Sequence, residues 1–202
     1  DASHELRNPL ASIRGYSELT RRQAADLPAD TGFALERIDA ESQRMSKLVN
    51  DLLLLARLDD HQALETRPVD MTEVVLNAVS DARAASPAHV WTLRLPDEPA
   101  MVSGEADRLH QVVTNLLSNA RTHTPSGTSV LTSVERDGDQ VVVRVIDDGP
   151  GITPEQQALV FERFARGDAA RTHSSAESTG LGLAIVSAVV TAHGGRVWLS
   201  SH

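Results

Sequence analysis

The stretch Val112-Val-Thr-Asn-Leu-Leu-Ser-Asn-Ala120 places two amide side chains within an otherwise apolar helical pattern. Asn115 and Asn119 are four residues apart, so on a helix over residues 107–122 they share one face. Amides at the edge of an apolar face need polar partners. A neutral amide oxygen is also a suitable ligand for Mg²⁺, which takes few protein groups besides phosphates. At this point, a pair of structural capping amides remains an open alternative.

A first glycine-containing stretch, Asp147-Asp-Gly-Pro-Gly-Ile152, follows a predicted strand directly. At the end of that strand, Asp147 could accept a hydrogen bond from the exocyclic amine of adenine. Gly149 and Gly151 would let the backbone approach the base closely, because they have no Cβ. Taken alone, however, this stretch is an ordinary Asp-Gly turn.

A second such stretch, Ser178-Thr-Gly-Leu-Gly-Leu183, opens a predicted helix. Gly180 and Gly182 would free backbone N–H groups at a helix N-terminus, which favours phosphate. The stretch is not a Walker loop, because no Gly-Lys-Ser/Thr follows, and it lacks the third glycine of a dinucleotide fingerprint. A lone Gly-x-Gly is weak evidence by itself.

The stretch Phe161-Glu-Arg-Phe-Ala-Arg166 lies just before residues 165–179, which contain almost no large apolar side chain and are expected to form a mobile loop. Phe161 and Phe164 could anchor one end of a lid, and Arg163 and Arg166 could reach a phosphate. The ordinary interpretation is the end of an amphipathic helix.

The N-terminal stretch, Asp1-Ala-Ser-His-Glu-Leu-Arg-Asn-Pro-Leu10, carries a histidine next to an acid. Residues 2–25 have a helical pattern. Within it, Pro9 removes a backbone donor and predicts a bend one turn beyond His4. Alternatively, Pro9 marks the helix start and residues 1–8 form a loop.

A second helix is predicted over residues 33–60, where Ile38, Met45 and Leu52 recur every seven residues. The apolar stripe is broader than one helical hairpin can cover. Two hairpins packed together would bury it as a dimeric four-helix bundle. The alternative is that the second domain covers the stripe.

Residues 61–68 are polar, end in proline and are expected to be a linker, so we predict two domains, 1–62 and 68–202. In the second, helices are predicted over 71–85, capped by Thr72, and over 107–122, 154–161 and 181–193. Strands are predicted over 89–95, 100–103, 128–136 and 140–146, with a hairpin turn at Asp137-Gly-Asp139. Residues 195–202 are expected to be a final strand. Because helices and strands do not alternate regularly, the fold class is α+β, a sandwich with helices on one face of a mixed sheet.

The composition excludes several classes of protein. The net charge of −9 argues against a nucleic-acid-binding protein, which needs a basic face. The absence of cysteine excludes disulfide scaffolds and thiolate zinc sites. No apolar run approaches the ~20 residues of a membrane span, so no membrane contact is expected from this chain. Both ends look cut, and we expect a fragment whose C-terminal end is truncated.

The order and spacing of these stretches are more specific than any one of them. Together they resemble the sensor histidine kinases of bacterial two-component systems, and the resemblance covers nearly the whole chain. It implies an N-terminal dimerisation and phosphoacceptor hairpin, followed by an ATP-binding domain of the gyrase/Hsp90/MutL type.

For the hairpin, the resemblance implies that His4 is the phosphoacceptor and Glu5 is the acid that polarises it. Asn8 matches the position that places water for dephosphorylation of the partner. The implied activity is ATP-dependent autophosphorylation on His4, transfer to an aspartate of a response regulator, and reversal of that result. The implied partners are a second copy of the chain and a receiver domain.

For the ATP-binding domain, Asn115 matches the Mg²⁺ ligand and Asn119 the second nucleotide-contacting amide. Asp147 matches the acid that reads adenine, with Gly149 and Gly151 shaping the pocket. The implied cofactors are ATP and Mg²⁺.

Arg166 matches a phosphate-contacting arginine before the lid, and Gly180 and Gly182 match the hinge behind the phosphates. The chain departs from the family at Thr122 and His123, where a lysine and an aromatic residue are frequent. The resemblance further implies a cytoplasmic fragment of an inner- or plasma-membrane sensor protein. Two alternative functions remain: a non-phosphorylating ATPase or clamp on the same nucleotide-binding fold, and an inert dimerisation scaffold.

Overall fold

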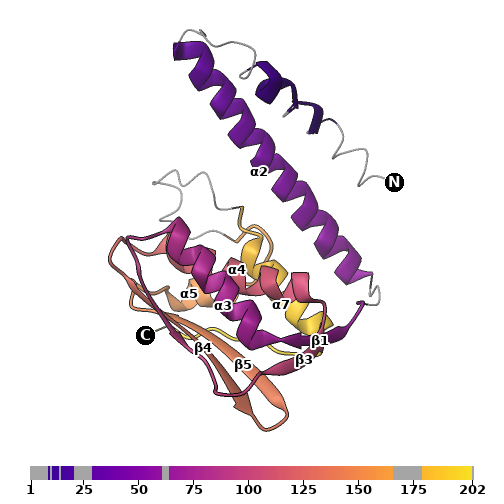
Figure 1. The fold of residues 1–202 in the computed structure, drawn as a ribbon, viewed down its shortest axis with the longest axis vertical. Helices are drawn as coiled ribbons and strands as arrows, with labels where there is room; N and C mark the ends of the chain where they lie inside the picture. Colours follow the sequence, from indigo (N-terminus) through magenta and orange to yellow (C-terminus); the bar gives the residue numbers. More distant parts are fainter. Residues whose placement is uncertain are drawn as a thin grey trace. The chain divides into compact units, whose positions relative to one another are not determined.

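The computed structural model of the protein describes residues 9, 11–13, 15–20, 29–60, 64–165 and 179–201. By their internal contacts the residues divide into two compact units, Asp1–Arg57 and Leu58–His202 (Figure 1). Most of the predicted loop over 165–179 lies outside the described residues. Within the described part of the chain, no helix has the length and apolarity needed to cross a membrane.

The first unit is a pair of helices. Residues 9, 11–13 and 15–20 are helical, and α2 spans Ala29–Asp59, beginning four residues before the predicted start. Pro9 is helical and exposed. The buried Ser17 hydroxyl donates to the carbonyl oxygen of Leu35 at 3.2 Å and so joins the two helices.

The predicted apolar stripe on α2 is partly uncovered in the single chain. Ile38, Met45 and Leu52 are 45%, 47% and 43% exposed, whereas Leu55 is buried. Ile38 also lines an apolar groove of about 330 Å³ between the two helices of the unit, together with Ile13, Tyr16, Ser17, Thr20 and Leu35. The heptad positions therefore present apolar surface that the single chain leaves partly exposed.

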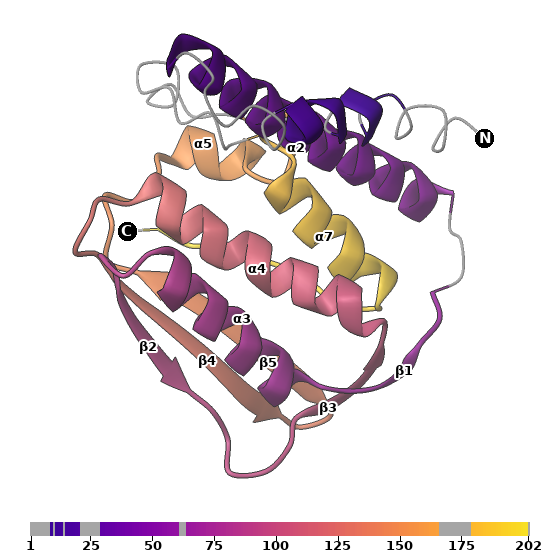
Figure 2. The ribbon, with the colours of Figure 1, turned by 45° about the horizontal axis from the view of Figure 1, so that its top comes forward.

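The second unit is an α+β arrangement, as predicted. In chain order its described elements are β1 (Arg67–Asp70), α3 (Met71–Ala85), β2 (Val90–Arg94), β3 (Met101–Gly104), α4 (Ala106–His123), β4 (Ser129–Asp137), β5 (Gln140–Asp147), α5 (Pro154–Leu159) and α7 (Gly182–Ala192). The sheet β2-β4-β5 is mixed: β2 is parallel to β4, and β4 is antiparallel to β5. Figure 2 shows α3, α4 and α7 side by side as a layer over the strands.

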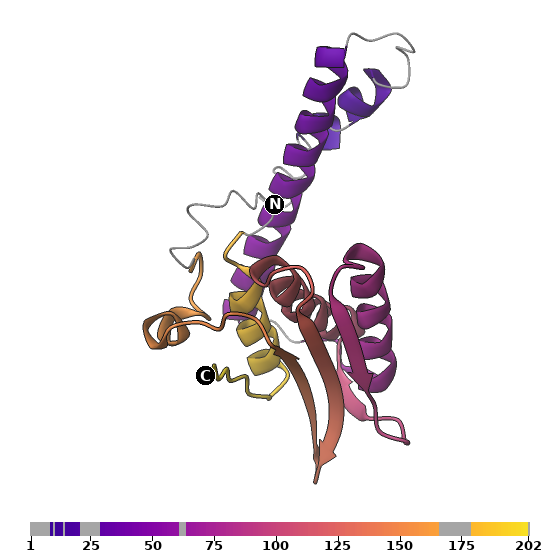
Figure 3. The same cartoon turned by 90° about the vertical axis from the view of Figure 1, so that its left-hand side faces the viewer.

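The β4–β5 hairpin confirms the predicted turn. Asp137 pairs with Gln140, which leaves Gly138 and Asp139 as a two-residue connection. Gly138 has φ +60°, a conformation that glycine adopts without steric cost. The long hairpin projects beyond the helical layer (Figure 3).

The core of the second unit is aliphatic and lies between the helices and the sheet. Its fully buried side chains alternate along β4 and follow the helical period on α3 and α4, as expected for elements with one buried face. They include Val75, Val79, Val113, Leu117, Val130 and Val134. Burial of these side chains at roughly 25 cal/mol per Å² of apolar surface supplies the main stabilising free energy of this unit.

The prediction that Thr72 caps α3 is wrong, because the N-cap is Asp70, the residue directly before the first helical residue, Met71. Asp70 has extended backbone angles, and its carboxylate accepts from the backbone N–H of Thr72 at 2.9 Å. The same oxygen accepts from the N–H of Ala100 at 3.1 Å. One carboxylate therefore both caps α3 and links it to the segment before β3.

Strand β1 was not predicted, and its first residues, Arg67 and Pro68, lie in the segment expected to be a linker. β1 pairs antiparallel with β3, placing Arg67 opposite Gly104. Proline is compatible with such a strand because a two-stranded ribbon has free edges on both sides. The pairing depends on β3, which lies more than thirty residues away in the sequence.

The predicted final strand over 195–202 is also wrong, since residues 195–201 form no strand. A strand needs a ladder of backbone hydrogen bonds with a neighbour. Here the backbone N–H of Gly195 bonds the carbonyl of Val190, and Ser201 accepts hydrogen bonds from Ile152 and Gln157. The alternating apolar pattern predicts an extended chain, but no strand edge receives it.

Replacing Asp70 with alanine is expected to lower the free energy of unfolding of the second unit by about 1–2 kcal/mol, because the helix loses its cap and the N–H of Ala100 loses an acceptor. Urea unfolding followed by circular dichroism measures this. The exposed Asp81 of the same helix provides the control, and Asp81→Ala should cost less than about 0.5 kcal/mol. Equal effects of the two substitutions would contradict the capping role.

Candidate functional site

Helix α4 carries the two predicted amides, and the first is held by the start of α7. The Asn115 side-chain nitrogen donates to the carbonyl oxygen of Gly182 at 3.2 Å. Since the amide nitrogen is used in this way, the oxygen on the other side of the same group is oriented to act as acceptor or ligand. The contact joins two of the predicted site residues that are 67 positions apart.

Asn119 follows one turn later on the same face of α4, and both amides are half-buried. The apolar face behind them is packed, with Leu109, Val113 and Leu117 buried and Leu116 half-buried. The helix therefore presents two amides at the border of a packed face.

Asp147 and Asp148 at the end of β5 have different roles. Asp148 accepts from the backbone N–H of Ser129 at 2.7 Å and so closes the start of β4. The exposed Asp147 accepts from the N–H of Gly149 at 3.0 Å. Of the two acids, Asp147 is thus the one held by the glycine turn, and its place in a nucleotide site stays a prediction.

Gly149 lies where a side chain does not fit. A Cβ at this position would be 2.6 Å from the Thr124 methyl group and 2.7 Å from the Asp147 carboxylate. Because Thr124 immediately follows α4, the Asp147–Gly149 turn contacts the C-terminal end of the helix that carries the amides. Two residues further on, Gly151 has φ +70°, which favours glycine.

Phe164 and Gly180 contact each other through their backbones. The N–H of Phe164 donates to the carbonyl of Gly180 at 2.8 Å. Both residues have positive φ, 63° and 69°. A Cβ at Gly180 would be 2.9 Å from the Phe164 Cα. The Phe164 ring itself is 58% exposed, so this end of the predicted lid is anchored by the backbone and not by that ring.

The remaining predicted site residues, His4, Glu5, Asn8 and Arg166, lie outside the described residues, and their roles stay predictions. The described residues contain no group of three or more histidine or acidic side chains that could hold a metal ion. Mg²⁺ usually keeps one or two protein ligands and binds phosphate oxygens and water besides. The donor set around Asn115 therefore fits Mg²⁺ that arrives with a nucleotide.

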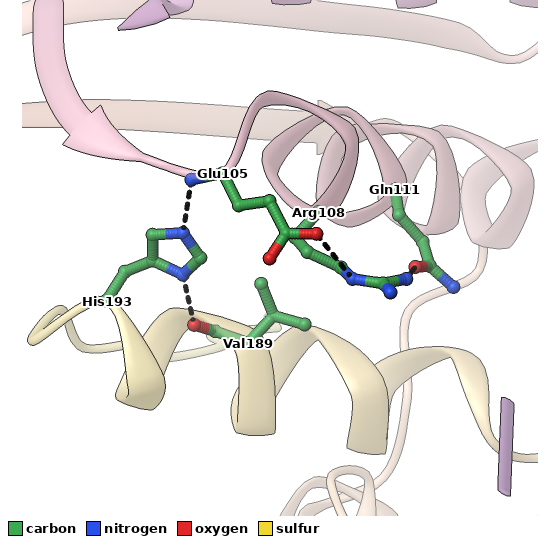
Figure 4. A network of polar contacts seen from close by, with 5 residues as sticks. All are labelled: Glu105, Arg108, Gln111, Val189 and His193. Carbon is green, nitrogen blue, oxygen red and sulfur yellow. Dashed lines mark hydrogen bonds and ion pairs between the residues drawn. The ribbon is translucent and has the colours of Figure 1, made fainter. Parts of the chain in front are cut away.

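Sequence reasoning did not identify a link between the start of α4 and the end of α7. His193 follows α7, and its Nε2 accepts from the backbone N–H of Glu105 at 3.1 Å, while Nδ1 donates to the carbonyl of Val189 at 2.8 Å (Figure 4). A backbone N–H can only donate, so the imidazole is neutral with its proton on Nδ1. Together with the Asn115–Gly182 bond, this bond holds both ends of α7 against α4.

The position of the His193 ring also explains why buried residue 104 is a glycine. A Cβ at Gly104 would lie 2.8 Å from the His193 ring. Beside it, the Glu105 carboxylate pairs with Arg108 at 3.2 Å, and Arg108 donates to Gln111 (Figure 4). The His-Gly-Gly sequence after α7 is the one local signal that could have pointed to this corner.

At the C-terminal end of α4, partial burial lowers the pKa of His123 below its ordinary value near 6.5. The neutral imidazole therefore predominates at pH 7, and this residue does not supply the cation that a lysine would bring to a phosphate at one of these positions.

The pKa of His123 gives a pH dependence with a defined sign. Because the folded-state value is depressed, its stabilising contribution is present above pH 6.5 and is lost as the pH falls through the folded-state value. A proton NMR titration should show a midpoint below that of an unfolded histidine. His123→Gln should remove this part of the acid sensitivity, and a midpoint above 6.5 would contradict the expectation.

Comparison with known proteins matches both parts of the chain. Residues 1–61 match the family of the His Kinase A (phospho-acceptor) domain. Residues 104–202 match the histidine kinase-, DNA gyrase B-, and HSP90-like ATPases. The chain is 57% identical over 201 residues to the probable sensor histidine kinase TcrY of Mycobacterium tuberculosis and 50% identical over 206 residues to TrcS of the same organism. Each alignment covers the whole chain, which spans 42% and 40% of those two proteins.

Solved structures agree. The mycobacterial sensor histidine kinase MprB is 35% identical, with a TM-score of 0.55 over 64% of this chain and 80% of that one. Full-length ShkA in complex with AMPPNP is 27% identical, with a TM-score of 0.79 over 96% of this chain and 40% of that one. The similarity thus extends over both units.

Proposed function

The chain belongs to the sensor histidine kinases of bacterial two-component systems, and from this membership we propose that it transfers the γ-phosphoryl group of ATP to His4 and then to an aspartate of a response regulator. The observation that supports this most directly is the arrangement along α4. Asn115 is held by Gly182 in the middle of the helix, and the Asp147–Gly149 turn contacts its C-terminal end. The chain spans about two fifths of its mycobacterial relatives, so activity, substrates and partners of the whole protein belong to the proposal.

In the proposed nucleotide complex, Asp147 accepts a hydrogen bond from the exocyclic amine of adenine, and Gly149 and Gly151 allow the base to approach the backbone. Asn115 would hold Mg²⁺ through its amide oxygen, and the ion would neutralise charge on the phosphates. Asn119 contacts the nucleotide one turn further along α4. The phosphates are contacted by Arg166, and the hinge behind them is formed by Gly180 and Gly182.

The proposed chemical step needs few groups. A neutral His4 nitrogen attacks the γ-phosphorus, a nitrogen–phosphorus bond forms, and the bond from phosphorus to the bridging oxygen breaks, so that ADP leaves. Glu5 accepts a hydrogen bond from the other ring nitrogen and stabilises the positive charge that develops. The phosphoryl group then passes to a receiver aspartate, as the nitrogen–phosphorus bond breaks and a carboxylate oxygen–phosphorus bond forms. Asn8 places the water that later hydrolyses this aspartyl phosphate and releases inorganic phosphate.

We further propose that residues 1–62 form the dimerisation and phosphoacceptor hairpin and residues 68–202 the ATP-binding domain. A second copy of the chain would cover Ile38, Met45 and Leu52 in a four-helix bundle, because these side chains are 43–47% exposed in one chain. The parent protein would be a membrane sensor with this part in the cytoplasm.

Incubation of the chain with ATP labelled on the γ-phosphate tests the proposal. We expect an acid-labile, alkali-stable label, which peptide mass spectrometry at alkaline pH places on His4. Label on His110 or on a hydroxyl would contradict the assignment. Turnover of ATP without label would instead support a clamp-type ATPase, and absence of nucleotide binding an inert scaffold.

A further inference from the structure

Three side chains form a directed hydrogen-bond chain between the ends of α3 and α4, which lie side by side (Figure 2). The Ser86 hydroxyl lies 2.8 Å from His89 Nδ1, and His89 Nε2 lies 3.1 Å from the Thr124 hydroxyl. Thr124 in turn donates to the carbonyl of Ala120 at 2.7 Å. We refer to Ser86, His89 and Thr124 as the relay.

The bond at the Thr124 end of the relay has a defined direction. Thr124 has a single hydroxyl proton, which the carbonyl of Ala120 receives, so the Thr124 hydroxyl accepts from His89 Nε2–H. With the proton of a neutral imidazole on Nε2, His89 Nδ1 accepts from the Ser86 hydroxyl.

At the Ser86 end, the relay is held by a hydrogen bond from Trp91. The indole N–H of Trp91 donates to the Ser86 carbonyl at 3.0 Å, and the His89 and Trp91 rings lie 5.8 Å apart. A threonine hydroxyl that both donates and accepts cannot rotate without losing one of these bonds, so χ1 of Thr124 is fixed in one staggered well.

In this rotamer the Thr124 methyl group points at the Asp147–Gly149 turn. The methyl carbon lies 2.6 Å from the position that a Cβ on Gly149 would occupy. The N–H of Gly149 is in turn bonded to the Asp147 carboxylate at 3.0 Å. Contact therefore runs from the relay, through the methyl group and Gly149, to the acid.

We propose that Thr124, locked by Ser86 and His89, is a positioning residue that sets the Asp147 carboxylate for recognition of a 6-aminopurine nucleotide. The inference rests on the proposed function, because it assumes that Asp147 accepts from the base. A purine with a 6-oxo group presents an acceptor to that carboxylate and gains nothing from its placement. The relay thus acts on base selection and not on phosphate binding.

The test compares the affinities of ATP and ITP, which carries the 6-oxo group, by calorimetry with the full chain. Thr124→Val keeps the shape but breaks the relay, and Thr124→Ser keeps the hydroxyl but removes the methyl group. We expect each to weaken ATP binding by about fivefold while ITP binding stays constant, so that the ATP/ITP affinity ratio falls by the same factor.

His89 provides a rescue series. His89→Leu should lower the ATP/ITP ratio as Thr124→Val does, whereas His89→Gln keeps a donor for Thr124 and should retain most of the ratio. The matched control is a threonine–histidine pair on the exposed face of α4, where the Thr114 hydroxyl lies 3.4 Å from His110 Nδ1. Thr114→Val and His110→Leu should leave the ratio unchanged.

Two outcomes overturn the inference separately from the proposed function. If the unchanged chain binds ATP but the Thr124 variants lower ATP and ITP affinity equally, or lower neither, Thr124 is only a helix-end residue. If the unchanged chain binds neither nucleotide, the proposed function and the inference both fail. For a variant of reduced stability, the Gly149 amide proton shift is the second readout, and an unchanged shift counts against the proposal.

Discussion

Replacing Gly180 with alanine is expected to lower the free energy of unfolding of the second unit by about 3 kcal/mol and to weaken nucleotide binding by about a hundredfold. The added Cβ would lie 2.9 Å and 3.0 Å from the Phe164 Cα and carbonyl carbon, and 3.1 Å from the Ala165 oxygen. All three are backbone atoms, which cannot rotate away as a side chain would. An L-residue at φ +69° adds a cost of about 1–2 kcal/mol.

The substitution also acts on the start of α7. Relief of the contact requires Phe164 and Gly180 to separate, and this breaks the 2.8 Å hydrogen bond between them. The start of α7, with the Gly182 carbonyl that holds Asn115, would then shift. We therefore expect stability and affinity to fall together.

Gly182→Ala is the control for the stability measurement. Its added Cβ would come no closer than 3.8 Å to Asn115, an ordinary contact, and alanine favours a helix by up to about 1 kcal/mol over glycine. Urea unfolding should find Gly182→Ala at least as stable as the unchanged chain. Equal destabilisation by both substitutions would contradict the steric account of Gly180.

Replacing Asn115 with aspartate is expected to weaken binding of Mg²⁺–ATP by about a hundredfold, although a carboxylate is the stronger magnesium ligand. Aspartate has the shape of asparagine but no donor. Its second oxygen would face the Gly182 carbonyl at the present 3.2 Å distance. Two acceptors at hydrogen-bond distance repel, and an unsatisfied half-buried group costs about 1–3 kcal/mol, so the carboxylate should turn away from α7.

Two simpler hypotheses predict other outcomes. If Asn115 acted only as a metal ligand, the aspartate variant would bind Mg²⁺–ATP as well or better. If added negative charge alone were responsible, Asn77→Asp, on the exposed face of α3, would weaken binding equally. Calorimetry of the three chains with and without Mg²⁺ separates the cases, and tighter binding by Asn115→Asp would refute the anchoring role of Gly182.

Local pattern was sufficient for much of the second unit. Helix α3 has the predicted bounds, and α4 extends one residue beyond the predicted range at each end, since an apolar face repeats along both. The β4–β5 turn follows from Gly138 between two alternating runs. Such elements bury one face, and that face imposes its period on the sequence itself.

The pairing of strands could not be predicted from the local sequence. Strand β1 exists because β3 offers an edge, and residues 195–201 are not a strand although they alternate. In both segments the deciding partner, or its absence, lies far along the chain, and nothing in the local residues identifies it. The cap of α3 differs, because Asp70 directly precedes the first helical residue, Met71, and is a local signal that the prediction of Thr72 overlooked.

The sequence by itself determined the family, the two-helix and α+β organisation, and the motifs Asn-x3-Asn, Asp-x-Gly-x-Gly and Gly-x-Gly, because each is a short pattern of residue types. Only the tertiary structure decided what holds those motifs. The His89–Thr124 and Glu105–His193 bonds join residues 35 and 88 positions apart. A donor finds its acceptor by position in space, and packing, not local periodicity, brings two such groups within hydrogen-bond distance.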